Sequence, residues 1–235
     1  MINEFIETML ACATLEDVGR AHGKALAREG FSASAGRAFV PGHGQQEHNF
    51  FLNWPAAWKR ISAERNFARK SAIVTEARRR FAPFTWSQLK SERTFTPVEN
   101  EAWTAAAEWG WTDGFTVPIH GPRGSFSVMG MAATEKGLDL SPAGRMRLSM
   151  MAVIVHERCC ALGKLAPARD MRAILSGREV ECLRWVADGR TDVEIAVILG
   201  ISAATVRFHV DNVRIKLGVR NRSQAVAQFA LAGML

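Results

Sequence analysis

Basic side chains gather near the C-terminal end of the chain, in a pattern that suits an acidic partner. The 235 residues include 30 lysines and arginines against 23 aspartates and glutamates, which gives a net charge of +7 at pH 7. From residue 205 onward a single acidic residue, Asp211, stands among five basic ones: Arg207, Arg214, Lys216, Arg220 and Arg222. Arginine can bind guanine through two hydrogen bonds in the major groove of DNA, and both basic residue types neutralise phosphates. The cluster therefore indicates duplex DNA as a partner.

Residue types that commonly carry out catalysis are scattered through the sequence. Five histidines have neither metal-ligand nor catalytic-triad spacing: His43, His48, His120, His156 and His209. No nucleophile elbow, carboxylate pair or nucleotide-binding glycine loop is recognisable. The four cysteines lack zinc-site or disulfide spacing, and reduced thiols in a cytoplasmic protein are the simpler interpretation. We therefore expect no enzyme activity, no metal and no cofactor.

Short helices at residues 175–235 are expected to position the basic cluster. Capping residues and helix-ending glycines alternate along this segment: Ser176, Thr191, Ser202 and Asn221 as N-caps, and Gly189, Gly200 and Gly218 as stops. A glycine-containing turn between a second and a third short helix is the layout of a helix-turn-helix. The alternative is a small helical bundle whose charges are simply solvated.

The preceding part of the chain predicts a mixed α/β domain. The spacing of apolar residues indicates helices at 2–10, 15–29, 55–66, 72–80, 97–109 and 141–162, and strands at 31–40, 48–53, 114–119 and 125–132. This order suggests an antiparallel sheet between helices, an α-β-α sandwich. The fold class is thus α+β, with a domain at 1–163, a linker at 164–174 and an all-α helix-turn-helix domain at 175–235.

The C-terminal segment resembles the LuxR/GerE DNA-binding domain. The matching stretches are LSGREVECLRWVADG at 175–189, EIA at 194–196, GIS at 200–202, TVRFHV at 205–210 and KLGV at 216–219. The resemblance implies base-facing positions for Arg207, Phe208 and Asp211. It implies DNA-backbone contacts for four more residues: Thr205, Arg214, Lys216 and Arg222. In this family the last helix commonly mediates dimer contacts, which implies such a role for Val226, Phe229 and Ala230.

The N-terminal domain resembles the autoinducer-binding domain of acyl-homoserine-lactone receptors. The matching stretches are NWPAAW at 53–58, FTWS at 84–87 and GWTDGFTVPI at 110–119. The resemblance implies a ligand pocket between the sheet and one helical layer. In that pocket, Trp58 matches the tryptophan that donates to the lactone carbonyl, Trp86 matches the aromatic residue near the ring, and Gly114 matches a glycine near the pocket floor.

Several positions depart from the receptor pattern in ways that weaken binding of the usual signal. Trp54 and Ser62 replace two tyrosines, Ser71 replaces the aspartate that accepts from the ligand amide, and Gly130 replaces a serine or threonine. A buried amide left without a partner costs about 1–3 kcal/mol. We therefore expect this protein to bind ordinary acyl-homoserine lactones more weakly than typical receptors do, by orders of magnitude.

Bulky indoles stand at further pocket positions, at Trp54, Trp103 and Trp111. Indole carries one N–H donor and no acceptor. Either the pocket accepts a flatter or aromatic ligand that brings acceptors, or the tryptophans fill it and the domain folds without a ligand. Filling is the interpretation we favour, and a plain core role remains the alternative for each tryptophan.

These observations predict a cytoplasmic, homodimeric regulator that binds a two-fold DNA operator, with a small-molecule signal as a possible second partner. No apolar run approaches the ~20 residues of a membrane span. Four residues of the helix at 141–162 could form a second dimer face or pack only on their own sheet: Leu148, Met151, Ile154 and Val155. The alternative function is a sequestering partner that inactivates another LuxR-type receptor by heterodimerisation.

Overall fold

A computed structural model describes residues 2–40, 46–67, 71–121, 124–134, 138–163 and 171–234. The chain divides into two compact units. The first holds the mixed α/β part and the second holds the helices from residue 171 onward, and each unit is described by itself.

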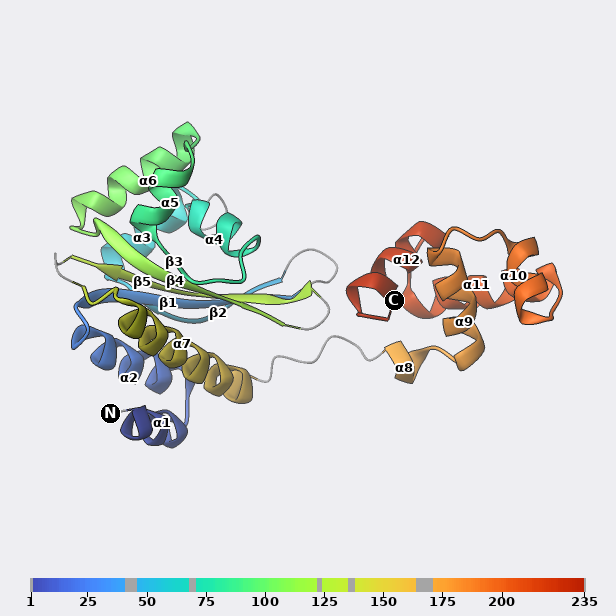
Figure 1. The fold of residues 1–235 in the computed structure, drawn as a ribbon, viewed down its shortest axis with the longest axis horizontal. Helices are drawn as coiled ribbons and strands as arrows, with labels where there is room; N and C mark the ends of the chain where they lie inside the picture. The colour runs from blue at the N-terminus through green and yellow to red at the C-terminus, as the bar shows by residue number, and fades with distance from the viewer. Residues whose placement is uncertain are drawn as a thin grey trace. The chain divides into compact units, whose positions relative to one another are not determined.

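A five-stranded antiparallel sheet forms the middle of the first unit (Figure 1). In chain order the strands are β1 (Phe31–Val40), β2 (Gln46–Asn53), β3 (Phe84–Thr85), β4 (Asp113–His120) and β5 (Phe126–Ala133). In space they lie in the order β2-β1-β5-β4-β3. Ala35 of β1 pairs with Gly130 of β5, which in turn pairs with Thr116 of β4. Successive side chains of a strand point to opposite faces of the sheet, so each strand supplies residues to two helical layers.

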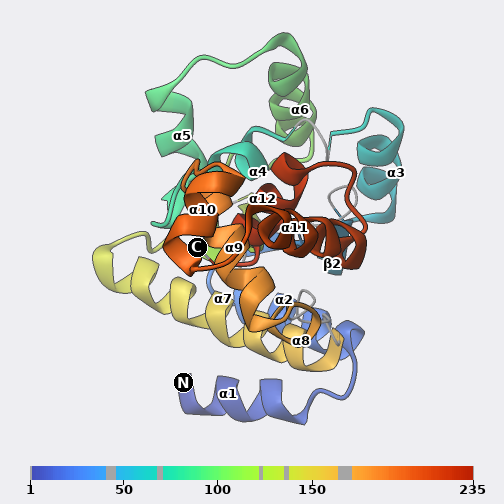
Figure 2. The same ribbon diagram turned by 90° about the vertical axis from the view of Figure 1, so that its right-hand side faces the viewer.

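Helices cover both faces of this sheet, as Figures 1 and 2 show. On one face lie α1 (Ile2–Ala11), α2 (Leu15–Ala27) and α7 (Pro142–Gly163), and on the other lie α3 (Ala56–Glu64), α4 (Ala72–Ala77), α5 (Trp86–Glu92) and α6 (Pro97–Glu108). The predicted α-β-α sandwich with an antiparallel sheet is therefore confirmed. The short β3 and α5 were not expected from the sequence.

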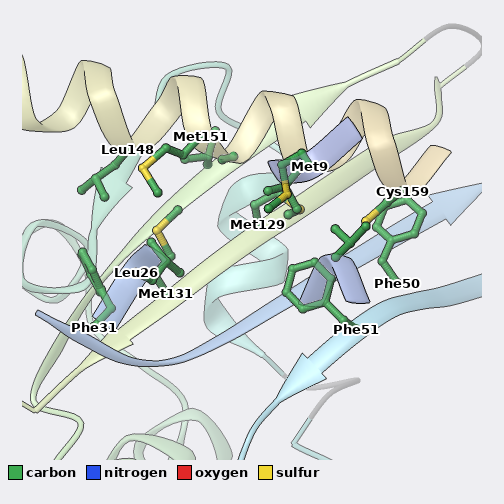
Figure 3. Close-up of a cluster of buried hydrophobic side chains, with 14 of the residues drawn as sticks. Met9, Leu26, Phe31, Phe50, Phe51, Met129, Met131, Leu148, Met151 and Cys159 are labelled. Carbon is green, nitrogen blue, oxygen red and sulfur yellow. The ribbon is translucent and has the colours of Figure 1, made fainter. Parts of the chain in front are cut away.

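The largest hydrophobic core of the first unit fills the space between the sheet and α1, α2 and α7 (Figure 3). Its labelled members come from six elements: Met9, Leu26, Phe31, Phe50, Phe51, Met129, Met131, Leu148, Met151 and Cys159. Gly36 pairs with Phe51 and Arg37 pairs with Asn49, so Phe50 is an extra residue in β2. This bulge lets two consecutive phenylalanines enter the same core.

The apolar face of α7 that was considered for dimerisation packs inside this core. Leu148, Met151 and Val155 are buried, and Ile154 is partly buried against the same cluster. The alternative, packing on the helix's own sheet, therefore holds for these four residues. The other face of α7 carries three large exposed apolar side chains: Met146, Met150 and Val153.

One titratable group lies deep in this core. His22 of α2 is 1% exposed, and neither of its ring nitrogens has a hydrogen-bond partner among the described residues. Its ring lies edge-on to Phe51, with 5.4 Å between the centroids. Burial disfavours the charged imidazolium and lowers the pKa of His22 to about 3.

We expect His22 to make the first unit sensitive to acid. Below the ordinary histidine pKa near 6.5 the unfolded chain binds a proton at His22, whereas the folded chain does not until about pH 3. Stability is therefore lost as the pH falls through this window, by roughly 1.4 kcal/mol per pH unit. His22→Leu should remove this part of the pH dependence, measured by urea unfolding with tryptophan fluorescence between pH 4 and pH 7. His209→Gln in the second unit is the control, and an unchanged slope in His22→Leu would contradict the assignment.

The second unit is entirely helical. Its helices are α8 (Met171–Ile174), α9 (Gly177–Ala187), α10 (Asp192–Leu199), α11 (Ala203–Leu217) and α12 (Arg222–Leu231). The four predicted N-caps, Ser176, Thr191, Ser202 and Asn221, each accept a hydrogen bond from the backbone N–H three residues later. The helix-turn-helix is thus confirmed: α10 ends at Gly200 and α11 at Gly218, with φ of +64° and +66°.

Helix α8 lies within the segment that was predicted to be a linker. Residues 164–170 of that segment lie outside the described residues. Ile174 of α8 is partly buried against the core of the second unit, which explains why the chain is already helical there.

No single helix in the described ranges is long and apolar enough to cross a membrane. Helices α10 and α11 reach such a length and composition only when taken together, with a bend of 107° between them. Within the same ranges, no group of three or more His, Cys, Asp or Glu residues could hold a metal ion.

Candidate ligand cavity and nucleic-acid interface

A cavity of about 140 Å³ lies in the first unit, on the side of the sheet that α3 to α6 cover. All eight residues that the sequence suggested for a pocket line it: Trp54, Trp58, Ser62, Ser71, Trp86, Trp103, Trp111 and Gly130. We call it the tryptophan cavity. Most of the remaining lining is apolar, with two charged exceptions, Arg37 and Glu99. The structure brings the predicted residues together, and their role in binding a ligand stays a prediction.

Glycines on two neighbouring strands shape the tryptophan cavity: Gly130 lines it directly, whereas Gly114 is not among the lining residues and acts through the neighbouring Trp86 ring. A Cβ atom at Gly130 would meet nothing within 4 Å, so the missing side chain leaves open space. A Cβ at Gly114 would lie 2.5 Å from Trp86 Cε2 and 2.4 Å from the backbone oxygen of Met131. Gly114 therefore allows the Trp86 indole to pack directly on the sheet, where its N–H donates to Thr116 Oγ1 at 3.3 Å.

Indole rings occupy much of the space that a large ligand would need. The rings of Trp58 and Trp111 pack edge to face with centroids 5.0 Å apart, and those of Trp86 and Trp103 do so at 5.3 Å. Pockets for drug-sized ligands usually measure about 300–1,000 Å³. The cavity, at about 140 Å³, is smaller than this range. The tryptophans thus fill the region without closing it completely.

Two of the side chains that bring oxygen acceptors to the tryptophan cavity, Ser71 and Glu99, are already engaged. Ser71 Oγ accepts from the backbone N–H of Val74 at 3.3 Å and so caps α4. The Glu99 carboxylate accepts from Arg93 Nη2 at 2.7 Å and from the backbone N–H of Thr96 at 2.9 Å. The Arg93 hydrogen bond is the main cause that holds the pKa of Glu99 below its usual value. Glu99 is therefore an ionised, paired carboxylate.

Arg37 is a cavity residue that the sequence interpretation missed. It lies on β1 and is 7% exposed, and its Nη1 is 3.2 Å from Glu47 Oε1. Its guanidinium carbon lies 5.1 Å from the ring centroid of Trp54, within cation–π range. Burial lowers the pKa of Arg37, although the Glu47 carboxylate opposes this shift. The alternation of side chains along β1 could have indicated that Arg37 faces the cavity. Residues two apart in a strand point to the same face of the sheet, and Ala35 also lines the cavity.

Helix α11 presents a polar face opposite its buried valines. Val206, Val210 and Val213 lie in the core of the second unit, whereas Arg207 and Phe208 are exposed. Asp211, the third predicted base-facing residue, is half-buried and pairs with Arg214 Nη1 at 2.7 Å.

Asp192, at the first turn of α10, contacts two of the predicted DNA-binding arginines. Its Oδ2 lies 3.5 Å from Arg207 Nε, and its Oδ1 accepts from Arg222 Nη1 at 3.3 Å. One carboxylate thus brings side chains from α11 and α12 together. The sequence interpretation did not single out Asp192.

Two family models match the chain. Residues 14–159 match the autoinducer binding domain, and residues 173–229 match the bacterial regulatory proteins of the luxR family. The chain belongs to the LuxR family. It is 35% identical over 182 residues to RpaR, an HTH-type quorum sensing-dependent transcriptional regulator of Rhodopseudomonas palustris, covering 77% of this chain and 73% of that protein. The family consists of transcription regulators, so the expectation that this chain is not an enzyme is confirmed.

Solved structures show the same fold. A crystal structure of Escherichia coli SdiA matches with a TM-score of 0.74 and 21% identity, covering 99% of this chain and 96% of that one. SdiA in complex with octanoyl-rac-glycerol matches with a TM-score of 0.70 and 20% identity, covering 98% and 93%.

Lys216 and Thr205, the other two predicted DNA-backbone residues of this LuxR-family chain, also have partners within the second unit, as Arg214 and Arg222 do. Lys216 Nζ donates to Glu179 Oε2 at 2.7 Å, and the same oxygen accepts from the backbone N–H of Ser176 at 2.7 Å. Thr205 Oγ1 is 2.8 Å from Ser202 Oγ at the start of α11. Lys216 therefore links α11 to the capped end of α9. If Lys216 also contacts a DNA phosphate, its ammonium group must bind the phosphate and Glu179 at the same time.

The predicted dimer residues of α12 fall into two groups. Phe229 is completely buried in the core of its own unit, so it is not available to a partner, and its assignment to a dimer face is wrong. Its large apolar ring completes the core between the helices. Val226 is half-buried and Ala230 is exposed, and their dimer role stays a prediction.

Proposed function

We propose that this regulator binds duplex DNA as a homodimer through α11, and that its tryptophan cavity does not take the usual acyl-homoserine lactone. The proposal about the cavity rests on one observation: among the described cavity residues, no carboxylate is free to accept a hydrogen bond from a ligand. Ser71 caps α4, and Glu99 is paired with Arg93. A lactone signal has an amide N–H that needs an acceptor when it is buried.

The small volume of the cavity supports the same proposal. An acyl tail, an amide and a lactone ring together need more space than about 140 Å³. The SdiA complex holds octanoyl-rac-glycerol, which has no lactone ring. A protein with this fold can thus hold a molecule other than a lactone. This supports our proposal that the cavity of the present chain either takes a different ligand or is filled by its tryptophans.

Exposed apolar side chains support a homodimer. Met146, Met150 and Val153 follow one another along the outer face of α7, and Ala230 is exposed on α12. Two recognition helices about 34 Å apart would match the half-sites of a two-fold operator. Such a dimer would act in the cytoplasm, where the DNA is.

One observation favours the alternative function of a sequestering partner. Asp192 contacts both Arg207 and Arg222, and it therefore offsets part of the positive charge that DNA binding needs. A protein of this kind would form heterodimers with another LuxR-type receptor and bind DNA poorly.

Gel shifts of the purified full chain against fragments of its own genome separate these functions. We expect specific shifts without any added signal, and no rise of the melting temperature with micromolar N-hexanoyl- or N-octanoyl-homoserine lactone. A ligand that binds only the folded state must raise stability, so a clear rise would contradict the ligand proposal. Failure to shift any fragment, together with heterodimer formation with a second receptor, would instead support sequestration.

A further inference from the structure

We propose that the tryptophan cavity binds a small aromatic carboxylate, with the Arg37 guanidinium as the group that pairs with the carboxylate. This inference rests on the proposed function, in which the usual lactone is not the ligand. Its three supports are the size of the cavity, its excess of hydrogen-bond donors and the buried charge of Arg37.

The size of the cavity selects a ligand with about one ring. An apolar cavity of roughly 150 Å³ in another protein is known to hold benzene, and this cavity measures about 140 Å³. Its walls include the indoles of Trp58, Trp86 and Trp111. Aromatic rings pack on one another in offset-stacked or edge-to-face arrangements, so such walls favour a flat aromatic ligand.

The polar groups of the cavity select a ligand that brings acceptors. The indole nitrogen of Trp103 is buried and has no hydrogen-bond partner in the described part of the chain. The side-chain oxygens of Ser71 and Glu99 are engaged by α4, Arg93 and Thr96, as described above. Unpartnered buried donors are unfavourable, and a ligand carboxylate offers acceptors to both Trp103 and Arg37.

The charge of Arg37 makes an anion the better ligand than a neutral acceptor. A guanidinium carries five N–H donors, and the structure gives Arg37 one ion pair among the described residues, to Glu47 at 3.2 Å. The Glu47 side chain is 30% exposed, so its carboxylate is partly solvated and neutralises Arg37 incompletely. A ligand carboxylate within the cavity can pair with the remaining donors, and charge-assisted bonds of this kind are roughly twice as strong as neutral ones.

The test is a binding titration of the full chain with benzoate and phenylacetate, each compared with its neutral methyl ester. We expect both acids to raise the melting temperature and to bind with a measurable Kd, and the esters to bind at least about tenfold more weakly. Arg37→Met should lose most of the affinity for the acids, and Trp103→Phe should weaken it several-fold. Arg60→Met, on an exposed position of α3 outside the cavity lining, is the matched control and should bind like the wild type.

A second variant keeps the test decisive if Arg37→Met does not fold. Glu47→Gln leaves Arg37 without its partner, so benzoate should bind about tenfold more tightly than to the wild type. Equal binding of acids and esters, or weaker binding of benzoate by Glu47→Gln, would overturn the inference. So would a wild-type protein that shifts DNA and yet binds neither acid at millimolar concentration, and that result leaves the proposed function standing. Stabilisation by a micromolar lactone is the separate result that overturns the proposed function itself.

Discussion

Replacing Arg207 by methionine is expected to abolish sequence-specific DNA binding and leave the fold of the second unit unchanged. The Arg207 side chain is 73% exposed on α11, and its one ion pair among the described residues is with Asp192. One bidentate contact to guanine contributes about 1–3 kcal/mol of discrimination. A homodimer makes this contact in both half-sites, so affinity for the specific site should fall by roughly 30-fold to 10⁴-fold. Fluorescence anisotropy with the fragment found in the gel shifts measures this loss.

Two further variants show whether the loss concerns sequence reading or charge alone. Arg222→Met removes a predicted phosphate contact, so it should weaken specific and non-specific binding alike and reduce the salt dependence. Arg178→Met removes an exposed arginine of α9 that pairs with Glu181, and it should bind like the wild type. Equal losses on specific and unrelated DNA for Arg207→Met would contradict a base-reading role. Unchanged melting temperatures for all three variants show that binding, and not folding, has changed.

The second unit was predictable from its sequence because local interactions set its helix ends. Ser176, Thr191, Ser202 and Asn221 each bond to a backbone N–H three residues later, so their effect does not depend on distant parts of the chain. Helix α8 was missed because its reason is not local: Ile174 packs on the core that the later helices build. The same holds for β3, whose two residues, Phe84 and Thr85, pair with Thr116 and Phe115 of β4, far away in the sequence.

The tryptophan cavity was predictable in its lining but not in its electrostatics. The positions of its tryptophans follow from the resemblance to autoinducer-binding domains, and the structure brings them to one place. Arg37 was missed because an arginine in a strand usually points to solvent. Its burial depends on Glu47 of a neighbouring strand and on Trp54, and only the assembled sheet brings these together. His22 was missed for the same reason, since its helix looks amphipathic with or without it.

Truncating Phe229 to alanine is expected to destabilise the second unit by about 3–5 kcal/mol, which is a large part of the stability of a small domain. The resemblance to the LuxR DNA-binding domain placed this residue on a dimer face, and the sequence alone could not correct this, because apolar residues of one helix face look alike whether they meet their own domain or a partner. Phe229 is fully buried against its own core, where its loss leaves a cavity that the surrounding helices cannot close completely. Circular dichroism during thermal unfolding should show the helical signal of this unit melting at a lower temperature.

Ala230→Glu separates this folding effect from dimerisation, because Ala230 is the exposed neighbour of Phe229 on α12. The new carboxylate should leave the melting temperature nearly unchanged and weaken the dimer on DNA if α12 contributes to it, measured by analytical ultracentrifugation of the complex. The two variants differ because successive residues of an α-helix are rotated by about 100° about its axis, so Phe229 lies in the core and Ala230 on the surface. If Phe229→Ala lowered dimerisation without lowering stability, the ring would belong to an interface after all, and the arrangement of α12 against α9 and α11 would have to differ from the one described.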